Sequence, residues 1–163
     1  MFLDFTKLDG LIAAVIQDAA DGRVLMVGFM NQAAFDQTVS SGHVTFFSRS
    51  RNRLWTKGET SGHTLVVEEI STDCDQDAVL IRAQALGPGV CHNGYRSCFY
   101  RRLENGAWRE SEARAFDPAA VYAAAPARAG SSAPPGGPAP TATATPAPTA
   151  RPVPRRDRQG ADS

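Results

Sequence analysis

Nearly all large apolar side chains lie before residue 126, so we expect only that part of the chain to fold. Nine of the eleven prolines lie in residues 126–163, where Val153 is the only large aliphatic or aromatic residue. A segment that can bury so little apolar surface cannot compensate the entropy lost when its backbone is ordered. We therefore expect one folded domain over residues 1–125, long enough to form a core alone, and a disordered Pro/Ala-rich tail over residues 126–163.

The formal net charge of zero combines two segments of opposite sign. Residues 1–124 carry 12 Lys and Arg against 15 Asp and Glu, whereas the remaining residues carry five Arg against two Asp. An acidic domain lacks the basic surface expected of a protein whose main partner is nucleic acid. For the basic tail, a solvated arm is a better interpretation than an RNA-binding segment.

The first ten residues do not resemble a targeting signal. They contain Asp4 and Asp9 and lack a basic region before an apolar run, which argues against secretion. No apolar run approaches the roughly 20 residues that a membrane span needs. We therefore expect a cytoplasmic protein with no membrane contact, whose three cysteines stay reduced and serve a metal or a reaction.

Alternating apolar residues and turn signals predict a domain dominated by strands. We expect strands over residues 11–16, 24–30, 43–50, 65–70, 78–85, 97–103 and 107–110. Two Asx-Gly pairs, Asp21-Gly22 and Asn105-Gly106, are strong signals for hairpins. Short connections of this kind favour antiparallel neighbours.

One clear helix interrupts these strands. Asn31 is a suitable N-cap, and apolar residues recur at helical spacing from there to Gly42. Asp117 is expected to open a second, short helix, and the polar residues 51–64 are expected to form a loop. The predicted fold class is α+β, a largely antiparallel sheet with one main helix and metal sites on loops and strand ends.

The segment DCDQD (residues 73–77) is the first motif that carries chemistry. In an extended strand its three aspartates point to one side, opposite Cys74. Three carboxylates held together repel one another unless a cation lies among them, and oxygen ligands suit a hard ion such as magnesium or calcium. The following residues lack the Gly and Glu that a calcium-binding EF-hand loop requires. Taken alone, the motif fits a solvent-facing acidic turn equally well.

Cys91 and Cys98, with Cys74 upstream, form the second motif. Thiolates are soft ligands matched to zinc, and three of them leave one tetrahedral position for water or substrate, as in catalytic zinc sites. Buried thiols without a metal are the alternative, which the polar, flexible neighbours of Cys91 and Cys98 make weaker. Because Cys74 is expected opposite the carboxylates, it should bind a different ion from theirs.

The third motif is the polar segment over residues 48–63, which suits a phosphorylated small molecule. It offers guanidinium groups, an ammonium group, hydroxyls and glycines that let backbone N–H groups approach a ligand. The candidate substrate-binding residues are Arg49, Arg51, Trp55, Lys57 and Ser61. Trp55 can stack on a base, although packing is the usual role of a single Trp. His63 is either a proton carrier or part of the polar surface.

Taken together and in order, these motifs resemble the phosphoribosyl-AMP cyclohydrolase family. The matching stretches are RSR (residues 49–51), LWxKGETSGH (54–63), DCDxD (73–77) and CHxGxRSCFYR (91–101). The likeness extends from about residue 11 to residue 108. Each stretch alone is weak, but the ordered set is specific.

The resemblance implies a histidine-biosynthesis enzyme that hydrolyses the N1–C6 bond of the adenine ring in 1-(5-phosphoribosyl)-AMP. It implies a homodimer whose two subunits share the zinc ligands. The implied ligands are Asp73, Asp75 and Asp77 for magnesium, and Cys74, Cys91 and Cys98 for zinc. In this interpretation a zinc-activated water attacks, magnesium positions the substrate, and His92 or His63 is the general base. The phosphates are expected at Arg49, Arg51 and Lys57.

Two other classes of protein fit the sequence less well. A zinc-stabilised RNA-binding module needs a basic folded face, which the acidic balance of residues 1–124 opposes. A zinc-dependent nucleotide deaminase normally shows H-x-E and P-C-x-x-C spacings, and neither occurs in this sequence.

Overall fold

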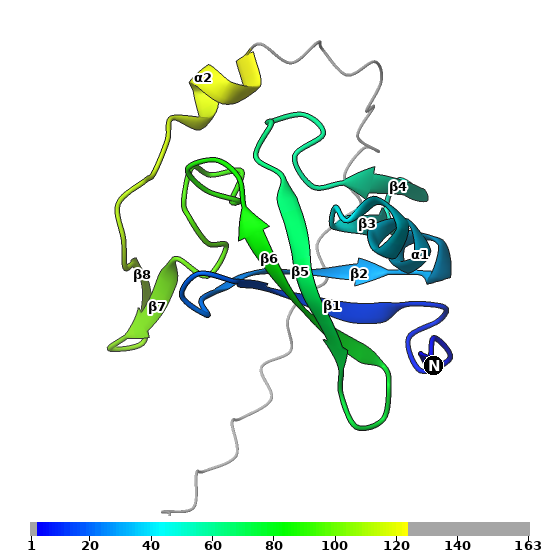
Figure 1. Cartoon of the computed structure of the whole chain (residues 1–163). Helices are drawn as coiled ribbons and strands as arrows, with labels where there is room; N and C mark the ends of the chain where they lie inside the picture. The colour runs from blue at the N-terminus through cyan, green and yellow to red at the C-terminus, as the bar shows by residue number, and fades with distance from the viewer. Residues whose placement is uncertain (1–2, 124–163) are drawn as a thin grey trace, which may run out of the picture. The chain divides into compact units, whose positions relative to one another are not determined.

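The computed structural model describes residues 3–123, so the tail predicted over residues 126–163 lies outside the described residues. The elements are β1 (Ile12–Asp18), β2 (Val24–Met30), α1 (Gln32–Ser41), β3 (Thr45–Ser48), β4 (Arg53–Thr56), β5 (Leu65–Thr72), β6 (Ala78–Ala85), β7 (Arg101–Glu104), β8 (Ala107–Glu110) and α2 (Pro118–Ala123). Four strands form a sheet in the order β2-β1-β6-β5, while β3 pairs with β4 and β7 with β8 (Figure 1). The prediction of a strand-rich domain with one main helix is confirmed.

The central pair of the sheet is the exception to antiparallel pairing. β1 pairs with β2, and β5 with β6, in antiparallel register, as the turn signals predict. β1 and β6, however, run parallel, from Ala13 opposite Ala78 to Asp18 opposite Ala83. Parallel neighbours need a long crossover, and here the crossover holds α1 and the β3–β4 hairpin.

The core lies on one face of this sheet. Ile12, Ala14 and Ile16 of β1 alternate inward, and Ile81 of β6 joins them, all with no exposed surface. Burying an isoleucine side chain of this kind contributes about 1.5–3 kcal/mol. These residues pack with side chains from α1, β3 and the start of β5 in a single cluster.

The opposite face of the sheet carries an exposed apolar row. Val15 of β1 lies opposite Val27 of β2 and opposite Leu80 of β6. Val27 is 43% exposed and Leu80 is 36% exposed. We refer to Val15, Val27 and Leu80 as the apolar row, which crosses three strands at the middle of the sheet.

The helix α1 begins and ends as predicted. The Asn31 side chain accepts a hydrogen bond from the backbone N–H of Ala34 at 2.9 Å, and Gly42 ends the helix with a φ of 68°. The prediction of a loop over residues 51–64 is wrong in part, because β4 lies within it. Trp55 of β4 pairs with Phe46 of β3, with ring centroids 4.9 Å apart, and this aromatic contact stabilises the hairpin.

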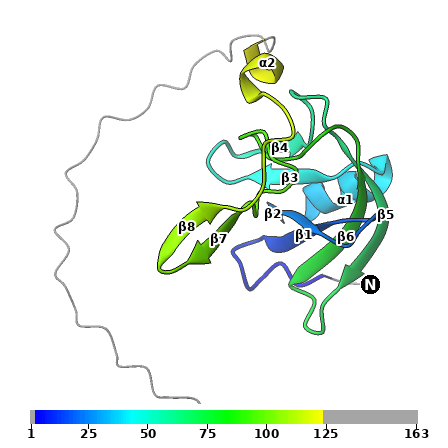
Figure 2. The ribbon, with the colours of Figure 1, turned by 90° about the vertical axis from the view of Figure 1, so that its left-hand side faces the viewer.

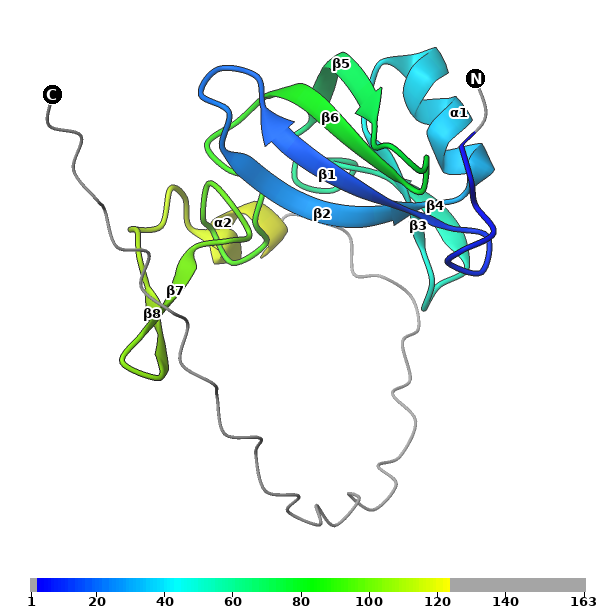
Figure 3. The same ribbon diagram turned by 90° about the horizontal axis from the view of Figure 1, so that it is seen from below.

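The β7–β8 hairpin also differs from its predicted length. The sequence predicts the first strand from residue 97, but it begins at Arg101. The preceding residues bond to β2 instead, where the backbone N–H of Cys98 donates to the carbonyl oxygen of Leu25. All residues of both strands are exposed, and the hairpin extends away from the four-stranded sheet in each view (Figures 1, 2 and 3). Within residues 3–123, no helix has the length and apolarity needed to cross a membrane.

Candidate functional site

The two predicted metal-binding motifs lie at opposite ends of β6. Residues 73–77 form the turn that leads from β5 into β6, and Cys91 and Cys98 lie in the loop that follows β6 (Figure 1). β6 has eight residues, and at about 3.3 Å per residue its two ends are about 23 Å apart. Two thiolates bound to one zinc lie only about 4 Å apart, given Zn–S bonds of about 2.3 Å. Among residues 3–123, Cys74, Cys91 and Cys98 do not come close enough together to hold one ion.

The acidic motif forms a compact turn. Residues 73–77 are not an extended strand, because Gln76 adopts a left-handed conformation with a φ of 64°. Asp73, Asp75 and Asp77 nevertheless each place a carboxylate oxygen within 4.8 Å of the others. Opposite oxygen ligands of magnesium lie about 4.2 Å apart, so this donor set fits a hard cation after a small closure. Among residues 3–123 no other cluster of three His, Cys, Asp or Glu side chains is as close.

Lys7 also lies at this turn, which no signal in the sequence predicts. Its Nζ atom is 2.6 Å from Asp75 Oδ2 and 3.2 Å from Asp77 Oδ2. The hydrogen bond from Lys7, and then its charge, lower the pKa of the Asp75 carboxyl. The contact joins residues 68 positions apart in the chain, so it depends on the tertiary fold.

The cysteine loop is attached to the edge strand β2. The backbone N–H of Cys98 donates to the carbonyl oxygen of Leu25 at 2.8 Å, and the buried Ser97 hydroxyl donates to the carbonyl oxygen of Val24 at 2.8 Å. Cys98 is exposed as a residue, but loss of water around its thiol, and then the neighbouring Cys91, raise the pKa of the Cys98 thiol to about 12. The Cys98 thiol therefore keeps its proton until a cation replaces it.

Lys57 lies beside this cysteine pair. Its side chain is buried, and its ammonium group donates to the carbonyl oxygen of His63 at 3.2 Å. Burial lowers the pKa of Lys57, while the nearby Cys98 and Cys91 act in the opposite direction. The structure thus places the buried Lys57 side chain next to both thiols.

His63 lies close to the same loop. Its Nδ1 atom is 2.9 Å from the carbonyl oxygen of Gly89, and its ring meets the Phe116 ring edge-on at a centroid distance of 4.6 Å. The Ser61 hydroxyl accepts a hydrogen bond from the backbone N–H of His63 at 3.3 Å. His92, the other predicted base, is an exposed residue of the cysteine loop.

Arg49 and Arg51 precede β4, at the end opposite Lys57, and Trp55 lies within the strand. The Arg49 guanidinium group lies over the Phe29 ring, 4.6 Å from its centroid, and Arg51 is exposed in the same turn. Arg49 and Trp55 line a cleft of about 390 Å³ between β2 and the β3–β4 hairpin. The predicted substrate contacts thus form two groups, one at this cleft and one with Lys57 beside the cysteines.

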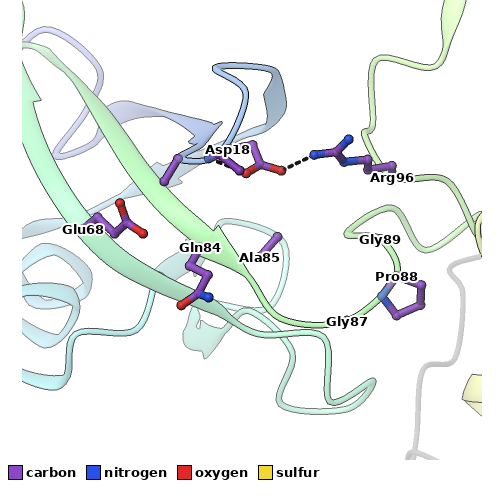
Figure 4. Close-up of a pocket in the computed structure, with 10 residues that line it drawn as sticks. Asp18, Glu68, Gln84, Ala85, Gly87, Pro88, Gly89 and Arg96 are labelled. Atoms are coloured by element: carbon purple, nitrogen blue, oxygen red, sulfur yellow. Dashed lines mark hydrogen bonds and ion pairs between the residues drawn. The ribbon is translucent and has the colours of Figure 1, made fainter.

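A second cleft, of about 380 Å³, contains an ion pair that sequence reasoning missed (Figure 4). Arg96 Nη2 lies 2.7 Å from Asp18 Oδ2 and 3.0 Å from Asp21 Oδ2. Burial by itself raises the pKa of Asp18, but hydrogen bonds from the Ala20 N–H and from Arg96 outweigh it, and the net pKa is lowered. Arg96 belongs to the last motif of the sequence, whereas nothing marks Asp18 at the end of its strand.

Comparison with known proteins connects these features to one family. The sequence model of phosphoribosyl-AMP cyclohydrolase matches residues 26–100. The phosphoribosyl-AMP cyclohydrolase of Solibacter usitatus is 65% identical over 122 residues, which cover 75% of this chain and 97% of that protein. Those of Geobacter sulfurreducens and Citrifermentans bemidjiense are each 54% identical over 120 residues, covering 74% of this chain and 96% of each relative.

Proposed function

Since the chain belongs to the phosphoribosyl-AMP cyclohydrolase family and is a hydrolase acting on C–N bonds, we propose that it opens the adenine ring of 1-(5-phosphoribosyl)-AMP. Water would add at C6 and the N1–C6 bond would break, as a cytoplasmic step of histidine biosynthesis. One observation supports this best: within each metal-ligand motif the side chains lie close together. These are three carboxylates at the 73–77 turn and two thiols in the loop after β6.

Two different ions fit these two sets of ligands. Asp73, Asp75 and Asp77 would hold magnesium, while Cys91 and Cys98 of one chain and Cys74 of a second would hold zinc. When bound, zinc supplies a Lewis acid that lowers the pKa of water, and magnesium supplies a hard charge for substrate oxygens. The buried Lys57 ammonium would offset part of the negative charge of the thiolates.

A homodimer would complete the set of three cysteines. In the single chain, Cys74 lies on the turn before β6, and Cys91 and Cys98 lie in the loop after it, without forming a cluster of three ligands among residues 3–123. If two copies pack face to face with their β6 strands antiparallel, a two-fold axis brings the 73–77 turn of each copy to the cysteine loop of the other. The exposed apolar row, to which β6 contributes Leu80, would supply the contact between the two sheets.

The geometry favours His63 over His92 as the general base. A carbonyl oxygen can only accept, so the contact with Gly89 requires a proton on Nδ1 of His63. In the neutral ring Nε2 is then the basic nitrogen, ready to take a proton from the attacking water. Packing against Phe116 further limits the orientation of the ring.

The two groups of cationic residues suit a substrate with two phosphates. Arg49 and Arg51 lie at one end of β4, and Lys57 follows its other end. We propose that these two groups bind the two phosphates, and that Ser61 assists beside Lys57. Trp55, between the two groups, would pack against the adenine base of the substrate.

An ultraviolet assay on 1-(5-phosphoribosyl)-AMP tests this function directly. The purified protein should convert this substrate when zinc and magnesium are both present, lose the activity in a chelator, and regain it when both ions are restored. Intact substrate after incubation with protein shown to contain both metals would overturn the proposal.

A further inference from the structure

Lys7 takes the position that a cation is expected to occupy at the acidic turn. Its Nζ atom is 2.6 Å from Asp75 Oδ2, 3.2 Å from Asp77 Oδ2 and 3.2 Å from the carbonyl oxygen of Asp75. These three oxygens match the three N–H donors of an ammonium group. The third carboxylate, of Asp73, accepts the backbone N–H of Ala78 at 3.2 Å.

The N-terminal segment holds Lys7 at this position. Leu3 and Phe5 pack against the main core. The backbone N–H of Asp4 donates to the carbonyl oxygen of Gln76 at 2.7 Å, which attaches the segment to the same turn. The backbone of Lys7 is therefore fixed by contacts that do not involve its ammonium group. The Lys7 side chain itself is 38% exposed, so its ammonium group can move into solvent while the segment stays in place.

We propose that Lys7 is a built-in competitor of the divalent cation at the 73–77 turn. Its ammonium group neutralises the repelling carboxylates when no metal is bound, and it must leave when a metal enters, because both need the same oxygens of Asp75 and Asp77. Lys7 would thereby lower the affinity of the turn for magnesium while keeping the metal-free turn folded. This inference rests on the magnesium site of the proposed function.

Calorimetric titration of the full-length, zinc-loaded protein with magnesium chloride tests the competition. Lys7→Met keeps the aliphatic part of the side chain and removes the charge. It should bind magnesium about tenfold more tightly, as expected when a unit charge close to a divalent ion is removed at a partly exposed site. The matched control, Lys7→Arg, keeps the charge and should stay within about threefold of the unmutated protein. Unchanged or weaker binding by Lys7→Met would overturn the inference.

Thermal unfolding gives a second readout that does not depend on turnover. In magnesium-free buffer Lys7→Met should melt a few degrees lower than the unmutated protein, because the carboxylates lose their counter-charge, and saturating magnesium should remove this difference. A further variant, Asp75→Asn, tests whether magnesium binds at the 73–77 turn. If this variant binds magnesium as well as the unmutated protein does, both the magnesium site and the role of Lys7 are wrong. If it loses magnesium while Lys7→Met binds normally, only the role of Lys7 is wrong.

Discussion

Mixing two inactive variants should restore activity if the cysteine set is shared between subunits. Cys74→Ser keeps an intact pair of Cys91 and Cys98, whereas Cys91→Ser keeps an intact Cys74. Neither variant can form a complete set with its own copies. In a mixed dimer, one of the two sites receives Cys74 from one chain and the intact pair from the other. Random exchange makes half of the dimers mixed, so the mixture should reach about one quarter of the unmutated activity.

The position of Cys74 in the single chain is the reason for this test. Cys74 lies on the turn before β6, Cys91 and Cys98 lie in the loop after it, and the three do not form a cluster of metal ligands within residues 3–123. A restored site would therefore combine residues of two chains. Restored activity should rise and fall with the fraction of mixed dimers.

The assay is turnover of 1-(5-phosphoribosyl)-AMP, with zinc content measured by elemental analysis after the variants are unfolded together and refolded. The matched control mixes Cys91→Ser with Cys98→Ser. Both changes then damage the same loop, so no combination of chains yields an intact pair, and activity should stay absent. Equal recovery in both mixtures, or none in the first mixture although mixed dimers form, would refute the shared arrangement.

Three further predictions follow from the site and the sheet. His63→Gln should lower kcat at least about 100-fold, whereas His92→Gln should have a much smaller effect; the reverse order would contradict the assignment of the base. Asp18→Asn should lose about 1–2 kcal/mol of folding free energy at pH 7, because its ionised form bonds to Arg96. The pKa of Asp18 is lowered on folding, so this stability is present above the ordinary value of 3.8 and is lost as the pH falls through the folded-state value. In urea unfolding, the difference in stability between Asp18→Asn and the unmutated protein should therefore shrink below that pH. Leu80→Glu should shift the protein to monomers in sedimentation while far-ultraviolet circular dichroism stays unchanged; an unchanged dimer would exclude the apolar row as the contact.

Local signals in the sequence predicted most of the elements. The Asn31 cap and the Gly42 end of α1 depend on side-chain and backbone preferences of single residues, and the structure has both. The same holds for the turn at Asn105 and Gly106, where both residues have positive φ. These features need no information about distant parts of the chain, which is why a sequence can reveal them.

Features that depend on tertiary contacts could not be predicted in this way. β4 lies in a polar segment and is stabilised by the contact of Trp55 with Phe46 across the hairpin. The parallel pairing of β1 with β6 leaves no turn signal, because the two strands are far apart in sequence. For the site, residue types indicated the carboxylates and thiols, but Lys7 and the pairing of Asp18 with Arg96 bring together segments that no local pattern connects.

The parallel pair at the centre of the sheet has a consequence for how the chain folds as it is made. β1 ends at Asp18 and its neighbour β6 begins only at Ala78. At about 5–20 residues per second, a ribosome needs roughly 3–12 s to synthesise the chain between them. During that time the hairpin of β1 and β2 has an open inner edge and an unfilled core face. The nascent chain should therefore depend on early burial of Ile12 and Ile16 against α1, or on a chaperone, until β6 arrives.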